Sequence, residues 1–126
     1  MDLTRMRALL DTNILIDYLN GEAKSRGEVE QRELPAISII TWMEVMTGAA
    51  DADQEIALRL FLSRFEVIGI DGEIAALAVK LRRKLRLKLP DAIIYASATA
   101  RRMLLVTRNS KDFRPQLEGV LIPYQL

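Results

Sequence analysis

The chain has 126 residues, of which half are hydrophobic, and a formal net charge of +1 at pH 7. A chain of this length is expected to form one domain that buries about two-thirds of the surface of its unfolded state. It contains no cysteine and no histidine, which excludes disulfides, zinc–thiolate sites, thiol nucleophiles and imidazole ligands, so catalysis would use oxygen groups, Lys, Arg or a bound ion.

Predicted strands and helices alternate along the chain. In order, they are a strand at 6–10, a helix at about 13–19, a charged short helix or loop at 22–33, a strand at 35–39, helices at 41–47 and about 53–65, a strand at 67–68, a helix capped by Asp71 that runs to Leu85, a helix at about 91–102, and strands at 104–106 and 120–122. This alternation predicts an α/β domain with a parallel sheet of about four to five strands. The strands are uniformly apolar, which is typical of a sheet covered on both faces.

No feature of the sequence indicates a membrane or an export pathway. No apolar run reaches the roughly 18 to 20 residues that span a bilayer, and the N-terminus lacks the pattern of a signal peptide. We therefore expect a cytoplasmic protein without a membrane partner.

Acidic and amide side chains lie at one expected edge of the sheet. Asp11 follows the first strand and Glu44 lies just beyond the second. Asn109 and Asp112 follow the next-to-last strand. Ligands bind at the carboxyl ends of parallel strands, so these groups are expected to converge. Asp91 begins the helix before that next-to-last strand, and topology alone does not place it at the same edge.

These groups predict a metal-dependent phosphodiesterase. Clustered carboxylates repel one another, and a divalent cation removes that penalty. Oxygen ligands favour Mg²⁺ or Mn²⁺ over zinc or copper. Such an ion orients a phosphate, activates water and stabilises the leaving oxygen. Mechanisms with one ion or with two ions both remain open.

Each acidic residue also has a structural explanation when it is taken alone. Asp11 can cap a helix, Asp91 can be a first-turn acid, Asp112 can belong to a turn, and Glu44 can face water. A catalytically weak α/β module that binds RNA or protein is therefore the alternative from another class. A nucleotide-binding domain is disfavoured because no glycine-rich turn follows the first strand.

The combined pattern resembles a known family. It consists of Asp11-Thr-Asn, Glu44, Asp91-Ala-Ile-Ile-Tyr-Ala and Thr107-Arg-Asn-Ser-Lys-Asp112-Phe, and it resembles the PIN-domain ribonucleases, especially the VapC-type toxins of bacterial toxin–antitoxin pairs. The resemblance implies a three-layer α/β/α sandwich and a Mg²⁺- or Mn²⁺-dependent endoribonuclease. It also implies a VapB-type antitoxin that blocks the site, and often a homodimer. A housekeeping nuclease that processes RNA is the nearest alternative.

The resemblance also assigns roles to individual residues. The implied catalytic acids are Asp11, Glu44, Asp91 and Asp112; the implied metal ligands are Asp11, Asp91, Glu44 and Asn109; and Asn13 and Thr107 support them. Asn109 stands where many relatives have an acid, so either its amide or Asp112 completes the site. The domain would span residues 1–126, with residues 1–5 as an extension, because Met6-Arg7 resembles the usual start.

Basic and apolar side chains leave two further alternatives open. Basic residues crowd the segment 80–88 and form either a solvated helix face or contacts to RNA phosphates. Arg108 and Lys111 are the predicted RNA contacts because they flank the expected edge. A final set contains Trp42, Met43, Met46, Phe61 and Phe65. Most of this set is expected in the core, and the alternative is a groove for an antitoxin helix or a dimer partner.

Overall fold

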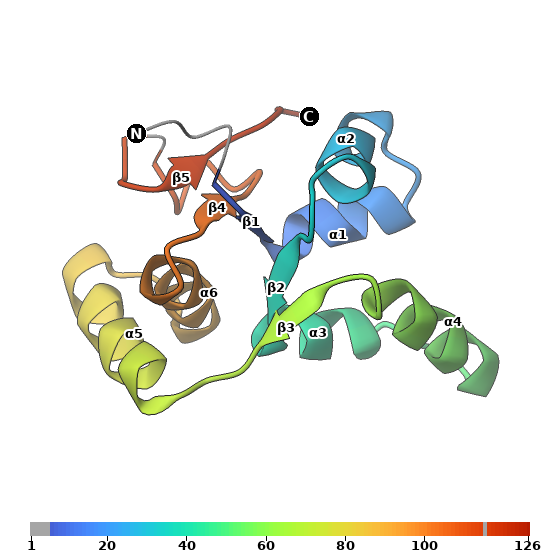
Figure 1. The fold of residues 1–126 in the computed structure, drawn as a ribbon, viewed down its shortest axis with the longest axis horizontal. Helices are drawn as coiled ribbons and strands as arrows, with labels where there is room; N and C mark the ends of the chain where they lie inside the picture. The colour runs from blue at the N-terminus through green and yellow to red at the C-terminus, as the bar shows by residue number, and fades with distance from the viewer. Residues whose placement is uncertain (1–5, 115) are drawn as a thin grey trace.

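A computed structural model describes residues 6–114 and 116–126 of the chain. Its strands form one sheet in the order β3-β2-β1-β4-β5, and every neighbouring pair is parallel (Figure 1). The strands are β1 (Ala8–Leu10), β2 (Ala36–Ser38), β3 (Glu66–Ile68), β4 (Leu104–Val106) and β5 (Val120–Leu121). The predicted parallel sheet is therefore confirmed. The proposed extension at residues 1–5 lies outside the described residues.

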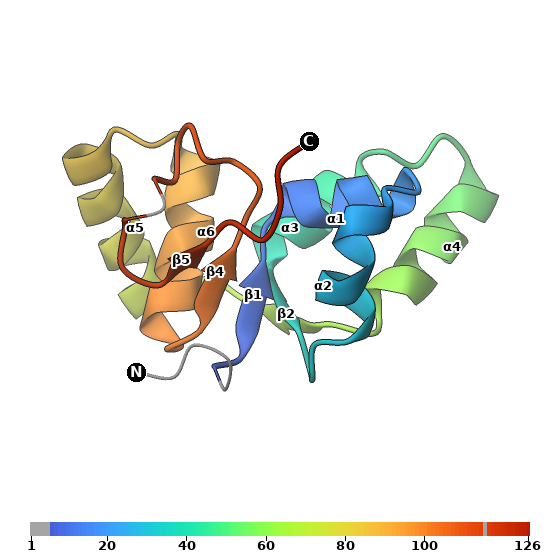
Figure 2. The same ribbon diagram turned by 90° about the horizontal axis from the view of Figure 1, so that it is seen from above.

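Helices cover both faces of this sheet, as Figure 2 shows. They are α1 (Thr12–Leu19), the short 3-10 helix η2 (Ala23–Ser25), α2 (Arg26–Glu30), α3 (Ile39–Met46), α4 (Ala52–Leu62), α5 (Gly72–Leu85) and α6 (Leu89–Ala100). The pair α5 and α6 lies on one side, and α1 to α4 lie on the other. This arrangement confirms the three-layer α/β/α sandwich. No helix of the described residues is long and apolar enough to cross a membrane.

The sheet separates two hydrophobic cores. Successive residues of a strand point to opposite faces. Leu9 therefore packs in the core under α5 and α6, whereas Ala8 and Leu10 pack in the core under the other helices. All three residues are buried, so a strand of three residues is long enough to anchor both layers. Because β1 is the central strand, it pairs with β2 on one side and with β4 on the other.

Some element boundaries differ from the predicted ones. The helix predicted at 41–47 begins at Ile39, because the side chain of Ser38 accepts a hydrogen bond from the backbone N–H of Ile40 (3.1 Å) and caps it. The charged segment 22–33 forms η2 and α2, with Val29 buried. The helix predicted to end near residue 65 ends at Leu62. These shifts do not change the order of the elements.

The strand order creates a switch point beside β1. The chain proceeds outward from β1 to β2 and β3 on one side and to β4 and β5 on the other. Open parallel sheets bind ligands at such a point, at the carboxyl ends of the strands. Asp11 follows β1 and Thr107 follows β4, and the backbone N–H of Asp11 donates to the carbonyl of Val106 (2.9 Å). The fold thus brings these two residues together.

Candidate metal centre

Asp11 is a buried carboxylate at the N-terminus of α1, where it is 4% exposed. Its Oδ1 accepts from the backbone N–H of Thr12 (2.7 Å), and its Oδ2 accepts from the hydroxyl of Thr107 (2.7 Å). Burial raises the pKa of Asp11 to about 6, repulsion from Asp91 and Glu44 adds to this rise, and the two hydrogen bonds oppose it. No Lys or Arg in the described part of the chain forms an ion pair with Asp11.

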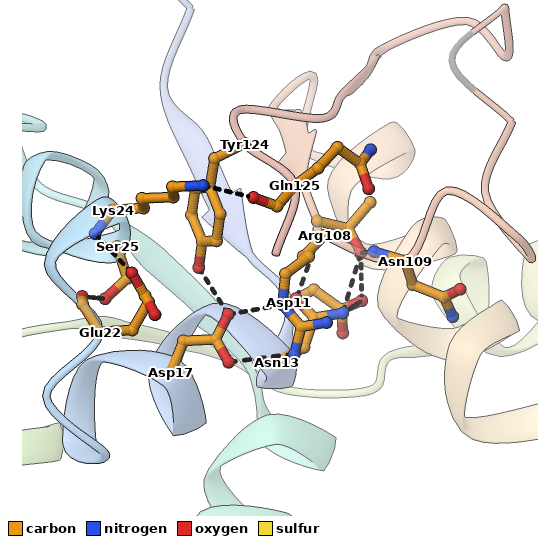
Figure 3. Close-up of polar contacts among 11 residues, drawn as sticks. Asp11, Asn13, Asp17, Glu22, Lys24, Ser25, Arg108, Asn109, Tyr124 and Gln125 are labelled. Carbon is orange, nitrogen blue, oxygen red and sulfur yellow. Dashed lines mark hydrogen bonds and ion pairs between the residues drawn. The ribbon is translucent and has the colours of Figure 1, made fainter.

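Thr107 and Asn13 hold the Asp11 side chain in one orientation. The buried Thr107 hydroxyl donates to Asp11 and accepts from Asn13 Nδ2 (3.2 Å) and from the backbone N–H of Asn109 (3.0 Å). Asn13 Nδ2 also lies 3.3 Å from Asp11 Oδ2, and its Oδ1 accepts from the backbone N–H of Arg108 (3.1 Å). These contacts tie α1 to the loop after β4 (Figure 3).

Glu44 lies on α3 and is linked to the start of α1 through a hydroxyl. The Thr12 hydroxyl donates to Glu44 Oε1 (2.7 Å) and lies 2.9 Å from the hydroxyl of Thr41. Because Thr12 has one hydroxyl proton, Thr41 must be the donor in their contact. These contacts hold Glu44 beside Thr12, the residue that follows Asp11 in the chain.

Asp91 lies in the first turn of α6 and shares the edge with the other acids. The N-terminus of α6 reaches this edge because the helix leads into the parallel strand β4. Burial raises the pKa of Asp91, repulsion from Asp112 and Glu44 adds to the rise, and Lys88 opposes it. The tertiary structure thereby places Asp91 at this edge of the sheet, which topology alone had not done.

Asn109 and Asp112 bind each other in the loop after β4. Asn109 Nδ2 donates to Asp112 Oδ2 (2.9 Å), and the backbone N–H of Asp112 donates to Asn109 Oδ1 (3.1 Å). The Asn109 amide and the Asp112 carboxylate are thus neighbours at one position of the edge. Either could supply an oxygen beside Asp91.

The donor set fits a hydrated divalent cation. Among residues 6–114 and 116–126, no group of three acidic side chains could hold a metal ion as it stands. Glu44 is turned toward Thr12, and Asp112 toward Asn109. The donors are nevertheless all oxygens, as hard cations prefer, and Mg²⁺ keeps several waters, so one or two direct carboxylates are enough. The acids repel one another, and a bound cation would reduce this repulsion.

Comparison with known proteins decides the family. The model of the PIN domain matches residues 8–114, a span that contains this entire edge. The chain belongs to the PIN-domain family. Ribonuclease VapC1 of Methanocaldococcus jannaschii is 35% identical over 112 residues, which cover 85% of this chain and 79% of that protein. The family resemblance of the sequence is therefore confirmed.

Solved structures show the same PIN-domain fold. A toxin–antitoxin complex from Klebsiella pneumoniae contains a chain that is 48% identical, with a TM-score of 0.89, and the match covers 94% of this chain and 99% of that one. VapBC2 from Rickettsia felis, bound to a DNA fragment from their promoter, is 25% identical with a TM-score of 0.77, and that match covers 96% and 99%. PIN-domain nucleases of the VapC type are generally dependent on a divalent metal.

The two predicted RNA contacts of this PIN domain lie in different surroundings. Lys111 is exposed on the loop after β4. Arg108 lies at the predicted edge, but its guanidinium binds Asp17, with Nε 2.6 Å from Oδ2 and Nη2 3.0 Å from Oδ1. A phosphate would have to compete with this ion pair. Lys111 is therefore the more accessible of the two side chains for a phosphate.

Four residues that form side-chain contacts at or near this edge were assigned no role from the sequence, namely Thr12, Thr41, Asp17 and Tyr124. Thr12 stands in the quoted motif, but the role of its hydroxyl depends on Thr41 and on the packing of α1 against α3. Asp17 carries a detectable signal, since it is a charged residue in the otherwise apolar run of α1. Tyr124, which donates to Asp17 (2.7 Å), carries no such signal.

Proposed function

We propose that this PIN domain is a Mg²⁺- or Mn²⁺-dependent endoribonuclease that acts as the toxin of a toxin–antitoxin pair. The observation that supports this most directly is Asp11, a buried carboxylate that has a pKa raised to about 6 and is repelled by Glu44 and Asp91. A buried charge is costly unless it is paired, and a cation would pair it. We infer that the substrate is RNA because this chain is similar in sequence to Ribonuclease VapC1.

Three acids and one amide would hold the cation. Asp11, Asp91 and Glu44 offer carboxylate oxygens, and Asn109 offers an amide oxygen. When bound, a divalent cation supplies a Lewis acid that polarises the scissile phosphate and lowers the pKa of a bound water. One and two cations are both compatible with this donor set.

Other residues at the edge would position the reacting groups. Asp112 is exposed next to Asp91 and can accept a proton from water. Thr107 and Asn13 keep the Asp11 carboxylate aimed at the edge through their hydrogen bonds. The exposed ammonium of Lys111 would bind a phosphate of the RNA next to this edge.

Substitution of the buried Asp11 and the partly buried Asp91 tests the nuclease. Asp11→Asn and Asp91→Asn should abolish both RNA cleavage and the thermal shift that Mn²⁺ produces. In the wild-type protein, Mn²⁺ at 100 times its dissociation constant should add about 2.7 kcal/mol of stability. Asp53→Asn is the matched control, because Asp53 is likewise a first-turn acid, on α4.

The nuclease assay also has a clear negative outcome. EDTA should silence the wild-type enzyme, and the Asp53→Asn variant should cleave as fast as the wild type. If cleavage survives both Asp11→Asn and Asp91→Asn, the activity comes from another site or from a contaminant. For cleavage that depends on Asp11 and Asp91, sequencing of RNA ends after brief induction would identify the class of RNA that is cut.

The antitoxin is proposed to bind a groove between α3 and α4. Trp42, Met43, Met46 and Arg59 are among the residues that line this groove, which has a volume of about 680 Å³. Phe61 and Phe65 are buried in the core, and Trp42 and Met46 line the groove while they also pack against that core. An apolar helix face fits such a groove. A basic antitoxin side chain could then reach Asp11 and Asp91 and take the place of the cation.

Co-expression with the adjacent reading frame tests the antitoxin. Met43→Arg should prevent copurification of the small partner, because Met43 is 43% exposed in the groove. Val79→Arg on α5 is the matched control, since Val79 is 45% exposed and lies outside the groove. An active nuclease that copurifies with no partner would indicate a housekeeping enzyme.

Two further expectations accompany this function. We expect a homodimer, which light scattering of the purified chain would detect as twice the mass of one chain. We also expect the protein to act in the cytoplasm, where its RNA substrate and its antitoxin would be made.

A further inference from the structure

A second buried acid, Asp17, lies on α1 and has no place in the mechanism proposed above. Its side chain is 7% exposed, and it accepts two hydrogen bonds from the guanidinium of Arg108 and one from the hydroxyl of Tyr124 (Figure 3). Burial alone would raise the pKa of Asp17, but the hydrogen bonds from Arg108 and Tyr124 outweigh burial and lower it. Asp17 is therefore ionised and held in place by two residues from distant parts of the chain.

Arg108 is held by α1 at two points. Asn13 Oδ1 accepts from its backbone N–H (3.1 Å), and Asp17 binds its guanidinium in the bidentate manner. Asn13 and Asp17 are four residues apart on one helix, so they face the same side. Arg108, which lies between Thr107 and Asn109, is thereby held against α1 through both its backbone and its side chain.

The C-terminal segment adds a third contact to the same place. Tyr124 reaches Asp17 Oδ2 (2.7 Å), and the ammonium of Lys24 donates to the carbonyl of Gln125 (2.8 Å). In Figure 2 the segment after β5 runs across the sheet edge toward α1. The last residues of the chain thus contact Asp17 and Lys24, and Asp17 in turn binds Arg108 of the loop after β4.

We infer that Asp17, Arg108 and Tyr124 are positioning residues that hold the loop after β4 on α1 and thereby set the affinity of the Asp11 site for its cation. This inference rests on the proposed function, because it needs a cation at Asp11. The connection runs from Arg108 to Thr107, whose hydroxyl donates to the Asp11 carboxylate. Groups that orient a metal ligand commonly change metal affinity by about 10- to 100-fold.

The competing role for Arg108 is a direct contact to an RNA phosphate. A phosphate contact depends on charge, so Arg108→Lys would largely preserve it. Positioning depends on the planar fork of the guanidinium, which Lys cannot reproduce. Arg108→Lys therefore separates the two roles, because the net charge is kept while the bidentate geometry is lost.

The experiment measures metal binding and RNA binding separately. Mn²⁺ affinity is measured by calorimetry without RNA, and RNA affinity is measured in EDTA at several salt concentrations. Arg108→Lys should weaken Mn²⁺ binding about 10-fold and leave the salt dependence of RNA binding unchanged. Tyr124→Phe should weaken Mn²⁺ binding in the same direction by a smaller factor.

Tyr18→Phe is the matched control for Tyr124→Phe. The Tyr18 hydroxyl also donates to a carboxylate, that of Glu30 (2.8 Å), but this contact has no connection to the loop after β4. Tyr18→Phe should bind Mn²⁺ like the wild type. Cleavage by Arg108→Lys should fall at limiting Mn²⁺ and recover at high Mn²⁺, with an unchanged KM for RNA.

Several outcomes would overturn the inference. Unchanged Mn²⁺ affinity in folded Arg108→Lys and Tyr124→Phe would refute it and would leave a charge contact to an RNA phosphate as the role of Arg108. If Arg108→Lys does not fold, Tyr124→Phe, which removes a single hydroxyl, decides the matter. A wild-type protein that neither binds Mn²⁺ nor cleaves RNA would overturn the proposed function as well, whereas an active wild type with unaffected variants would overturn this inference alone.

Discussion

Asp11 and Asp17 are nearly equally buried, at 4% and 6% exposure, yet the fold shifts their pKa values in opposite directions. Asp17 faces a guanidinium and a phenol, which lower its pKa although burial raises it. Asp11 faces a hydroxyl and a backbone N–H together with two other acids, and its pKa rises to about 6. Burial alone therefore does not identify a functional acid. The absence of a compensating cation around Asp11, within the described residues, makes it the candidate ligand site.

Neutralising Asp11 has the largest expected effect on stability. In metal-free protein at pH 7.5, Asp11→Asn should increase the free energy of unfolding by up to about 3 kcal/mol, because the shift from 3.8 to about 6 corresponds to that energy. Urea denaturation in EDTA measures it. A variant that is less stable than the wild type would show that the charge of Asp11 does not destabilise the folded protein.

The same energy should be visible as a dependence on pH. The pKa of Asp11 is higher in the folded than in the unfolded protein, so its contribution to stability is complete below pH 3.8 and is lost as the pH rises to about 6. The stability difference between wild type and Asp11→Asn should therefore grow between about pH 4 and pH 6 and then level off. Mn²⁺ affinity should rise over the same interval, because the cation displaces a proton. A difference that stays constant over this pH range would contradict the assignment.

Removing the charge of Asp17 should have the opposite sign. Asp17→Asn leaves the guanidinium of Arg108 without its counter-charge and should cost about 2 kcal/mol, less than for a fully buried pair because Arg108 is 31% exposed. The lowered pKa of Asp17 means that this stabilisation exists above its unfolded value and is lost as the pH falls through the folded value. Denaturation of both proteins at neutral and acidic pH measures the difference, which should shrink in acid.

The smallest expected effect concerns the hydroxyl that joins the two networks. Thr107→Val should cost about 1 kcal/mol and should raise the pH at which Mn²⁺ binding is half complete, because the Thr107 hydroxyl lowers the pKa of Asp11. Ser25→Ala is the matched control, since Ser25 is also fully buried but its hydroxyl donates to the backbone carbonyl of Glu22 (2.7 Å) instead of to Asp11. Equal shifts in both variants would argue against a specific role for Thr107.

Local patterns were sufficient to predict most elements and the acids that follow the strands. Asp11 could be assigned because a carboxylate directly follows a buried apolar run and precedes a helix. The start of α3 at Ile39 was missed because this apolar residue continues the pattern of β2, and only the cap at Ser38 marks the change. Asp91 was identified by its motif, but its position at the edge required the direction of α6.

Periodicity and residue type are local properties, so they were sufficient to predict the order of strands and helices, the oxygen-only donor set and the resemblance to PIN domains. Three contacts depend on the tertiary structure instead: Arg108 pairs with Asp17, Tyr124 donates to the same acid, and Thr12 donates to Glu44. These partners are distant in sequence, and each could have bonded to water or to another group. Their selection depends on how α1, α3, the loop after β4 and the C-terminal segment pack against one another, which no local pattern encodes.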